Sequence, residues 1–223
     1  MYDIVAGHWL RFKTKAKTPK AGHGSHLIYL PPQKKFFFLG GGGTYLYDPA
    51  KNDWEALRPA GPRPPQPMDA ASCYDPRRQL IYVAMGSYPK KDSKEVENRV
   101  HAYDVRKNVW IDLKAKGKLP PRPRPVSGSG ITRMHYDSAN YVILFFSFAT
   151  DITGSLERRG IYAYDAGKNE WTLATGKFAP DWPRGCNHTF YDPVLNAHFI
   201  YKAGDSRGKG TMFVYRYKPA GKK

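Results

Sequence analysis

Hydrophobic residues along this chain either alternate with polar ones or run in short unbroken stretches. Alternation is typical of half-buried β-strands, and short apolar runs are typical of strands buried on both faces. GTYLYD (Gly43 to Asp48) and GIYAYD (Gly160 to Asp165) alternate, whereas LIYVAM (Leu80 to Met85) and YVILFF (Tyr141 to Phe146) are unbroken. No stretch of helix length shows a period of 3.6, so the pattern predicts an all-β protein.

A motif in which a Tyr-Asp pair precedes a Trp occurs four times, and the Trp is always the seventh residue after the Tyr. The copies are YDIVAGHW (Tyr2 to Trp9), YDPAKNDW (Tyr47 to Trp54), YDVRKNVW (Tyr103 to Trp110) and YDAGKNEW (Tyr164 to Trp171). The fifth residue after each Tyr is Gly7, Asn52, Asn108 or Asn169. These residue types tolerate a positive φ, which predicts a tight turn between two strands.

The other residues of the motif have structural roles in this interpretation. Each Asp can accept hydrogen bonds from N–H groups of its own turn; these residues are Asp3, Asp48, Asp104 and Asp165. We expect the four indole side chains to lie in the core; these are Trp9, Trp54, Trp110 and Trp171. Replacing Trp110 with Ala should therefore cost roughly 3 to 5 kcal/mol.

A second series of tyrosines, interleaved with the first, marks the end of another strand in each repeat. The series consists of Tyr29, Tyr74, Tyr136 and Tyr191. A turn follows each of them, then the apolar strand, then the strand that ends in Tyr-Asp, then the Trp strand. Each repeat therefore contains four strands. The predicted units are residues 24–57, 69–113, 129–174 and 186–217, with an N-terminal strand at 8–12.

Four-stranded units that recur about every 45 to 60 residues are typical of β-propellers, whose blades pack face to face around a channel. The repeat resembles the kelch family, and with it the central domain of galactose oxidase. A strand closes on adjacent glycines, as at Gly40 to Gly43, and is followed by the Tyr-Asp strand and the Trp. The other repeats have MGS, FSF and AGD in place of these glycines. The resemblance implies one kelch-type propeller domain over residues 1–223.

Two arrangements of the blades are compatible with the sequence. Residues 1–3 correspond to the end of a third strand, and the last repeat stops after its third strand, GTMFVYRYKP. The N-terminal strand at 8–12 could complete that last blade and close a ring of four blades. Alternatively, the chain is the carboxyl-terminal part of a larger propeller of six or seven blades. We expect the second arrangement, because an unpaired sheet edge favours aggregation.

Positive charge concentrates in the segments that join one blade to the next. The formal net charge is +17, from 36 Lys and Arg against 19 Asp and Glu. The basic linkers are RFKTKAKTPKAGHG, LRPAGPRPPQP, LKAKGKLPPRPRP and GKFAPDWPRG. We expect them to emerge on the face that carries the loops between second and third strands, and to give that face a positive potential. The alternative is that Lys and Pro only keep these loops soluble and stiff.

Candidate ligand-binding residues lie three positions before each tyrosine of the second series. These positions hold His26, Ala71, Arg133 and His188. Together with His23, Trp182 and Arg184 from adjoining loops, they would form a cationic rim that binds a carboxylate or phosphate. Trp182 lies outside the repeated motif and could anchor a partner, stack on a sugar or cover its own blade. The alternative for the rim is that these groups satisfy backbone carbonyls or water molecules along the channel.

The sequence predicts neither catalytic residues nor a cofactor nor a metal. Cys73-Tyr74 and His135-Tyr136 are similar to the ligand types of galactose oxidase, but both tyrosines occupy the repeated structural position. Cys73 and Cys186 lie at different places in their repeats, so we expect no disulfide between them. A GxSxG elbow and a phosphate-binding loop are both absent. The longest apolar run is far below the roughly 18 residues that cross a bilayer.

Three hypotheses for function follow. The first is a non-catalytic binding module that presents a cationic loop face to an acidic protein segment or an anionic polysaccharide. The second is a fragment of a larger propeller enzyme, an oxidoreductase or carbohydrate-active enzyme whose catalytic residues lie upstream. The third is binding of nucleic acid through basic linkers and aromatic stacking, although no recognised nucleic-acid motif accompanies the charge.

Overall fold

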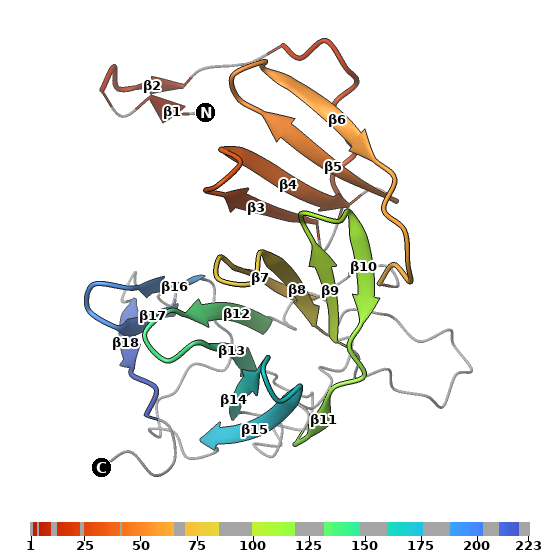
Figure 1. Cartoon of the computed structure of the whole chain (residues 1–223). Coiled ribbons are helices and arrows are strands. Elements are labelled where there is room, and N and C mark those ends of the chain that lie inside the picture. Colours follow the sequence, from red (N-terminus) through yellow and green to blue (C-terminus); the bar gives the residue numbers. More distant parts are fainter. Residues whose placement is uncertain are drawn as a thin grey trace.

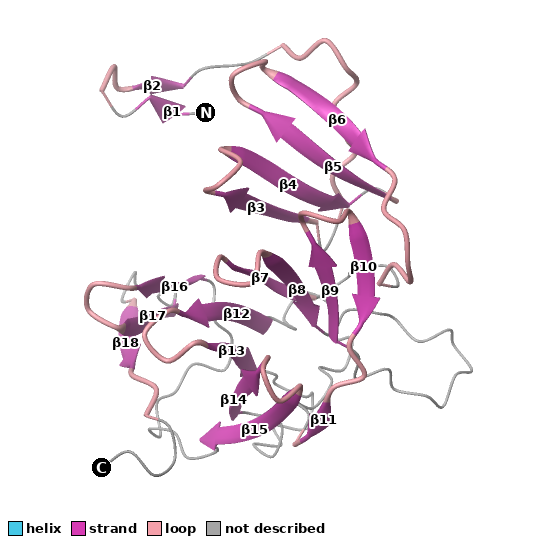
Figure 2. Ribbon diagram, in the orientation of Figure 1, coloured by secondary structure: helices cyan, strands magenta, loops and turns pink. Residues whose placement is uncertain are grey.

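The structure is a computed structural model that describes residues 2–3, 5–9, 13–22, 25–40, 42–64, 70–84, 100–118, 132–147, 160–175, 188–202 and 210–218. Strands, turns and short connections make up all of this described part, which contains no helix (Figure 2). The all-β prediction is therefore confirmed. Within the same ranges, no helix is long and apolar enough to cross a membrane.

Four antiparallel sheets follow one another along the chain, and each sheet is one blade. Blade 1 contains β3 (His26–Leu30), β4 (Lys35–Gly40), β5 (Gly43–Asp48) and β6 (Asp53–Leu57). Blade 2 contains β7 (Ala71–Asp75), β8 (Leu80–Ala84), β9 (Val100–Asp104) and β10 (Val109–Asp112). Blade 3 contains β12 (Thr132–Asp137), β13 (Val142–Ser147), β14 (Gly160–Asp165) and β15 (Glu170–Thr175). Blade 4 contains β16 (His188–Asp192), β17 (Ala197–Lys202) and β18 (Thr211–Tyr215).

The blades are arranged as a four-blade β-propeller, with the first strand of each blade on the inside. β3 lies next to β7, β7 next to β12, and β12 next to β16. Figure 1 shows the four sheets following one another in an arc, with β6, β10 and β15 on its outer side. The predicted order of strands within a blade is confirmed, because the strands of each blade are hydrogen-bonded in chain order.

Alternation along the strands gives every blade two faces. Cross-strand partners share a face, so one face of blade 2 holds Cys73 and Tyr82, which are register partners, and the other holds Tyr74 and Ile81. Cys73 and Tyr82 pack in a core with residues of blade 3, whereas Ile81 packs in a core with residues of blade 1. We call these the following face and the preceding face, after the neighbouring blade that each one meets.

Each contact between blades buries a following face against a preceding face. Between blades 1 and 2, the buried residues are Leu30, Phe37, Leu39, Ile81, Val83, Tyr103 and Trp110. Between blades 2 and 3, they include Cys73, Tyr82, Met134, Phe145, Tyr164 and Trp171. Between blades 3 and 4, they are Leu144, Phe146, Ile161, Ala163 and Ile200. Trp110 and Trp171 are each only 1% exposed, so the repeated indole seals its blade against the preceding one.

The Tyr-to-Trp motif forms the same hairpin wherever it occurs. The register pairs are Tyr2 with Trp9, Tyr47 with Trp54, Tyr103 with Trp110 and Tyr164 with Trp171. The fifth residue after each Tyr has a positive φ, between 50° at Asn52 and 68° at Gly7. The Asp Oδ1 atoms of the three blade motifs, Asp48, Asp104 and Asp165, each accept two turn N–H groups at 2.8 to 3.3 Å.

The asparagine of the motif also ties the preceding linker to the blade, a role that the sequence did not suggest. In blade 2, Tyr103 donates its hydroxyl proton to Asn108 Oδ1 at 2.8 Å. This bond orients the amide so that Asn108 Nδ2 donates to the carbonyl of Arg58 at 3.4 Å. The equivalent bonds occur in blades 1 and 3, where the linker acceptors are Lys13 and Leu113. We call this pair of bonds the asparagine latch.

One prediction about the N-terminal copy of the motif is wrong, and one of the two arrangements left open by the sequence is not formed. β2 (His8–Trp9) pairs with β1 (Tyr2–Asp3) in a separate two-stranded sheet, and it does not complete blade 4. Trp9 is 79% exposed rather than in the core. Figure 1 shows this hairpin apart from β18. The motif specifies a hairpin locally, but burial of its indole requires a neighbouring blade, which Trp9 lacks in the described part of the chain.

Candidate functional site

Three of the predicted rim residues lie at the same end of first strands. His26 and His188 are the first residues of β3 and β16, and Arg133 is the second residue of β12. His188 is exposed, whereas His26 and Arg133 are partly buried. His26 Nδ1 lies 2.8 Å from Ser72 Oγ on β7, so this histidine joins blade 1 to blade 2. A ligand-binding role for these residues stays a prediction. His23, Trp182 and Arg184 lie outside the described residues.

The described parts of three linkers lie along the outer edge of the blade that follows each of them. Ala60 forms a parallel bridge with Val109 of β10. β11 (Lys116–Gly117) pairs in parallel with the start of β15, and Ala16 N donates to Asp53 Oδ1 at 2.8 Å. We expected the linkers to gather over the loops between second and third strands. The asparagine latch holds them against the beginning of the fourth strand. In addition, Arg63 of the second linker donates to the carbonyls of Gly42 and Gly43, in the loop between the second and third strands of blade 1. A positive potential on that face stays a prediction.

These linker segments are strongly basic. Residues 13–22, 58–64 and 113–118 contain no Asp or Glu, and their cations are Lys13, Lys15, Lys17, Lys20, Arg58, Arg63, Lys114, Lys116 and Lys118. We call this set the linker cations. The cations of the tight turns are placed differently, because they lie next to the turn carboxylates. Arg78 is 2.9 Å from Asp75, and Lys168 is 3.8 Å from Asp165.

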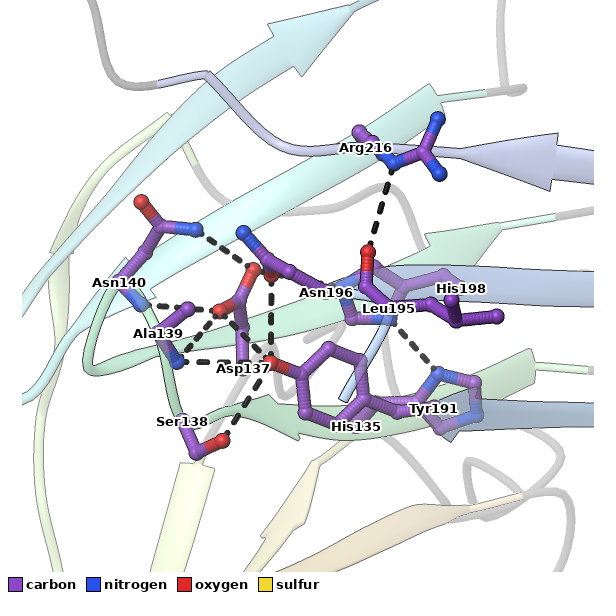
Figure 3. Close-up of polar contacts among 10 residues, drawn as sticks. All are labelled: His135, Asp137, Ser138, Ala139, Asn140, Tyr191, Leu195, Asn196, His198 and Arg216. Carbon is purple, nitrogen blue, oxygen red and sulfur yellow. Dashed lines mark hydrogen bonds and ion pairs between the residues drawn. The ribbon is translucent and has the colours of Figure 1, made fainter. Parts of the chain in front are cut away.

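A buried polar cluster joins blades 3 and 4 (Figure 3). The rings of His135 on β12 and His198 on β17 are stacked, with planes 5° apart and centroids 5.4 Å apart. Their Nδ1 atoms are 3.1 Å apart. His135 Nε2 lies 2.7 Å from Thr189 Oγ1, and His198 Nε2 lies 3.3 Å from Asp137 Oδ2. A continuous chain of hydrogen bonds therefore runs from Thr189 through both imidazoles to Asp137.

Asp137 is the anionic end of this chain and is fully buried. Asn140 donates to it from both its backbone and its side chain, each at 2.9 Å. Tyr191 also donates to Asp137 Oδ1, at 3.4 Å. Burial opposes ionisation of Asp137, but hydrogen bonds from His198 and Asn140 outweigh it and hold the pKa of this carboxyl below its ordinary value.

His135 is neutral at physiological pH. Burial is the main cause, and the neighbouring His198 adds to it, so that the pKa of His135 falls to about 3. A neutral imidazole has one N–H donor and one bare acceptor nitrogen. His135 therefore donates to one of its two partners, His198 Nδ1 or Thr189 Oγ1, and accepts from the other. This arrangement makes the cluster a specific polar contact between two blades.

The sequence pattern does not predict this cluster, because His135 and His198 are 63 residues apart. The available signal was the alternation in β12, where Arg133, His135 and Asp137 occupy the face opposite to Tyr136. This face of β12 meets the next blade. Three polar side chains on it therefore indicate a polar contact between the two blades.

Metal chemistry finds no support among the described residues, where no group of three or more His, Cys, Asp or Glu side chains could hold a metal ion. Cys73 is buried in the core between blades 2 and 3, and burial raises the pKa of its thiol well above the ordinary value. Cys73 and Tyr74 point to opposite faces of their strand, as do His135 and Tyr136.

Comparisons with known proteins find similarity to a kelch-domain protein. No protein-family profile matches it. Human Kelch domain-containing protein 1 is 25% identical over 153 residues, which cover 55% of this chain and 37% of that protein. Mouse multiple epidermal growth factor-like domains protein 8 is 22% identical over an alignment 247 residues long, gaps included. The alignment covers 97% of this chain and 8% of that protein.

A solved structure with a similar arrangement of strands is the extracellular domain of a B. thetaiotaomicron protein described as a hybrid two-component system. It has a TM-score of 0.43 and 9% identity, over 82% of this chain and 21% of that chain. The matched kelch-domain relatives and the four antiparallel blades described above agree with each other. The chain is a four-blade β-propeller that is similar to kelch-domain proteins.

Proposed function

We propose that this propeller is a non-catalytic binding module whose linker cations bind an acidic protein segment, with an anionic polysaccharide as the alternative ligand. The kelch-like fold is compatible with a protein-interaction module. The observation that carries the charge-based part is the separation of cations in the described residues. Turn cations lie beside turn carboxylates, whereas the linker cations lie on segments without Asp or Glu along the outer edges of blades 1 to 3. Lys15 among them lies close enough to Asp53 of β6 to help lower the pKa of that carboxyl.

The physical reason is the range of electrostatic attraction. Unpaired surface cations raise the local concentration of an anionic partner, and this effect is screened beyond about 10 Å at 0.1 M salt. Cations beside carboxylates attract an anionic partner much less, because the fields of the two opposite charges nearly cancel about 10 Å away. The rim residues His23, His26, Arg133, Trp182, Arg184 and His188 remain predicted additional contacts.

The experiment compares two triple variants of equal charge change. One replaces Lys17, Lys20 and Lys118 with Gln, all exposed linker cations. The matched control replaces Lys51, Lys107 and Lys168 with Gln, which occupy the same position of three successive turns. Binding to a fluorescent polyglutamate peptide is measured by anisotropy over a salt series. We expect the linker variant to bind several-fold more weakly with a shallower salt dependence, and the control to bind like the wild type.

Two further probes separate the kinds of ligand. A sulfated polysaccharide and a single-stranded DNA are used at matched charge. Tighter binding of the polysaccharide would assign that alternative, and tighter binding of the DNA would favour the nucleic-acid hypothesis. Polyglutamate affinity that does not change between low and physiological salt would contradict the proposal, as would an equal loss in both triple variants.

A further inference from the structure

The preceding face of blade 1 is apolar, and no other blade covers it within the described residues, although Phe38 in this face is only 8% exposed. Leu27 and Tyr29 on β3 are 61% and 47% exposed. They continue into an aromatic surface, in which the Tyr29 and Phe36 rings are 5.0 Å apart and the Phe38 and Trp54 rings are 5.8 Å apart. Trp54 is only partly buried, although the equivalent Trp110 and Trp171 are almost fully buried. The difference arises because no blade covers this face within the described residues.

The following face of blade 4 is uncovered in the same way. Phe190 on β16 is 52% exposed, and its ring stacks on Phe199 with centroids 4.8 Å apart and planes 9° apart. Met212 and Val214 of β18 are also exposed, and their register partners on β17 are Tyr201 and Phe199. These side chains lie on the face that, in blades 1 to 3, packs against the next blade.

Charge is absent from most of both faces, in a chain whose net charge is +17. By the strand register, the preceding face of blade 1 consists of Leu27, Tyr29, Phe36, Phe38, Tyr45, Tyr47, Trp54 and Ala56. The following face of blade 4 consists of His188, Phe190, Asp192, Ala197, Phe199, Tyr201, Met212 and Val214. Neither strand face contains Lys or Arg. Contiguous apolar surface depleted of charge is typical of a protein interface.

The two faces are also the two halves of one kind of interface. Each of the three contacts inside the chain joins a following face to a preceding face, and the uncovered surfaces are one of each. They lie on the first and last blades of the arc (Figure 1). We propose that they dock head to tail between copies of this chain, so that blade 4 of one copy packs on blade 1 of another as consecutive blades do.

A second copy is the occupant that the surfaces themselves specify. Both halves of the contact are present on every chain, so each of two identical copies offers the surface that the other one lacks. The resulting interface is heterologous, because different surfaces meet, and it closes into a ring if the rotation between copies allows closure. The contact repeats a geometry that the chain already forms three times, with an aromatic preceding face against an apolar following face.

The test measures mass by sedimentation velocity over a concentration series, at a salt concentration that screens the net charge. Leu27→Lys places a charge on the preceding face of blade 1, and Phe190→Lys places one on the following face of blade 4. Val194→Lys adds the same charge at a turn residue that is 91% exposed, and serves as the matched control. We expect the wild type and the control to associate, and each of the other two variants to stay monomeric.

Mixing the two interface variants gives the decisive measurement. Leu27→Lys retains a native blade 4 face, and Phe190→Lys retains a native blade 1 face, so a mixture should form one-to-one heterodimers. This association also shows that both variants are folded. A wild type that stays monomeric at its highest soluble concentration would overturn the proposal. Self-association of either variant alone would also overturn it, because each variant retains only one of the two native faces. A mixture of the two variants that remains monomeric would overturn it as well.

Discussion

Asn108 shows how one side chain connects a turn, a strand and a linker. Its φ is +54°, and its amide accepts from Tyr103 and donates to Arg58. Asn108→Gly keeps the backbone conformation but removes both hydrogen bonds, so we expect a loss of about 1 to 2 kcal/mol in the free energy of unfolding. Asn108→Ala should lose roughly a further 1 kcal/mol, because Ala disfavours a positive φ.

Denaturant unfolding of the two variants beside the wild type checks this order. The stability lost in Asn108→Gly reports the two side-chain hydrogen bonds. The difference in stability between the two variants reports the cost of a positive φ at a residue with a Cβ. A Gly variant as stable as the wild type would show that the latch contributes nothing to stability.

His135 should make the contact between blades 3 and 4 sensitive to acid. Its pKa is about 3 in the folded chain and 6.5 ordinarily, so the unfolded chain binds a proton first as pH falls. Stability is therefore complete above about pH 6.5 and is lost progressively toward about pH 3. The lowered pKa of Asp137 acts in the same direction, and the nearby cation Arg133 also disfavours a charged His135.

Unfolding midpoints at about pH 7.5 and about pH 5 test this linkage. We expect the midpoint of the wild type to fall more over this interval than that of His135→Gln, which cannot take the proton. His8→Gln, at an exposed histidine of the N-terminal hairpin, serves as the control and should behave like the wild type. Equal pH dependence in wild type and His135→Gln would contradict the assignment.

Linkers between blades act as structural elements rather than as simple connections. Gly61 has a φ of +82°, and a Cβ at this position would overlap the carbonyl oxygen of Trp110. Gly61→Ala should therefore destabilise the chain by about 2 kcal/mol or more, through strain and displacement of the linker from β10. Gly22→Ala is the control, since a Cβ there meets nothing within 4 Å. Thermal melts of both variants measure the difference, and equal melting temperatures would contradict it.

The strands of each blade could be predicted from sequence because their signals are local. The run from Leu80 to Met85 corresponds to β8 at Leu80–Ala84, and the hairpins begin and end where Tyr-Asp and Trp predict. Contacts between segments far apart in sequence could not be predicted in this way. The linker docking at Ala60 and the pairing of His135 with His198 depend on which blades become neighbours. Of the candidate site, alternation placed His26, Arg133 and His188 at one end of the first strands, but it gave no contacts for them.

The arc of four blades exposes the same surfaces at its ends that it buries between blades. Trp110→Ala should cost roughly 3 to 5 kcal/mol at any protein concentration, because blade 1 of the same chain always covers this indole. Trp54→Ala should cost less in a dilute sample, where the preceding face of blade 1 is in water. In a concentrated sample its cost should rise, because docking of a second copy buries Trp54 and stabilises the folded state by mass action.

Calorimetric melts of the wild type, Trp54→Ala and Trp110→Ala at low and high protein concentration measure both effects at once. The melting temperature of the wild type should increase with concentration, and the gap between the wild type and Trp54→Ala should widen. The gap to Trp110→Ala should stay constant, because its partner surface belongs to the same chain. A gap to Trp54→Ala that is independent of concentration would mean that nothing covers blade 1 in solution, and head-to-tail docking would then have no energetic basis.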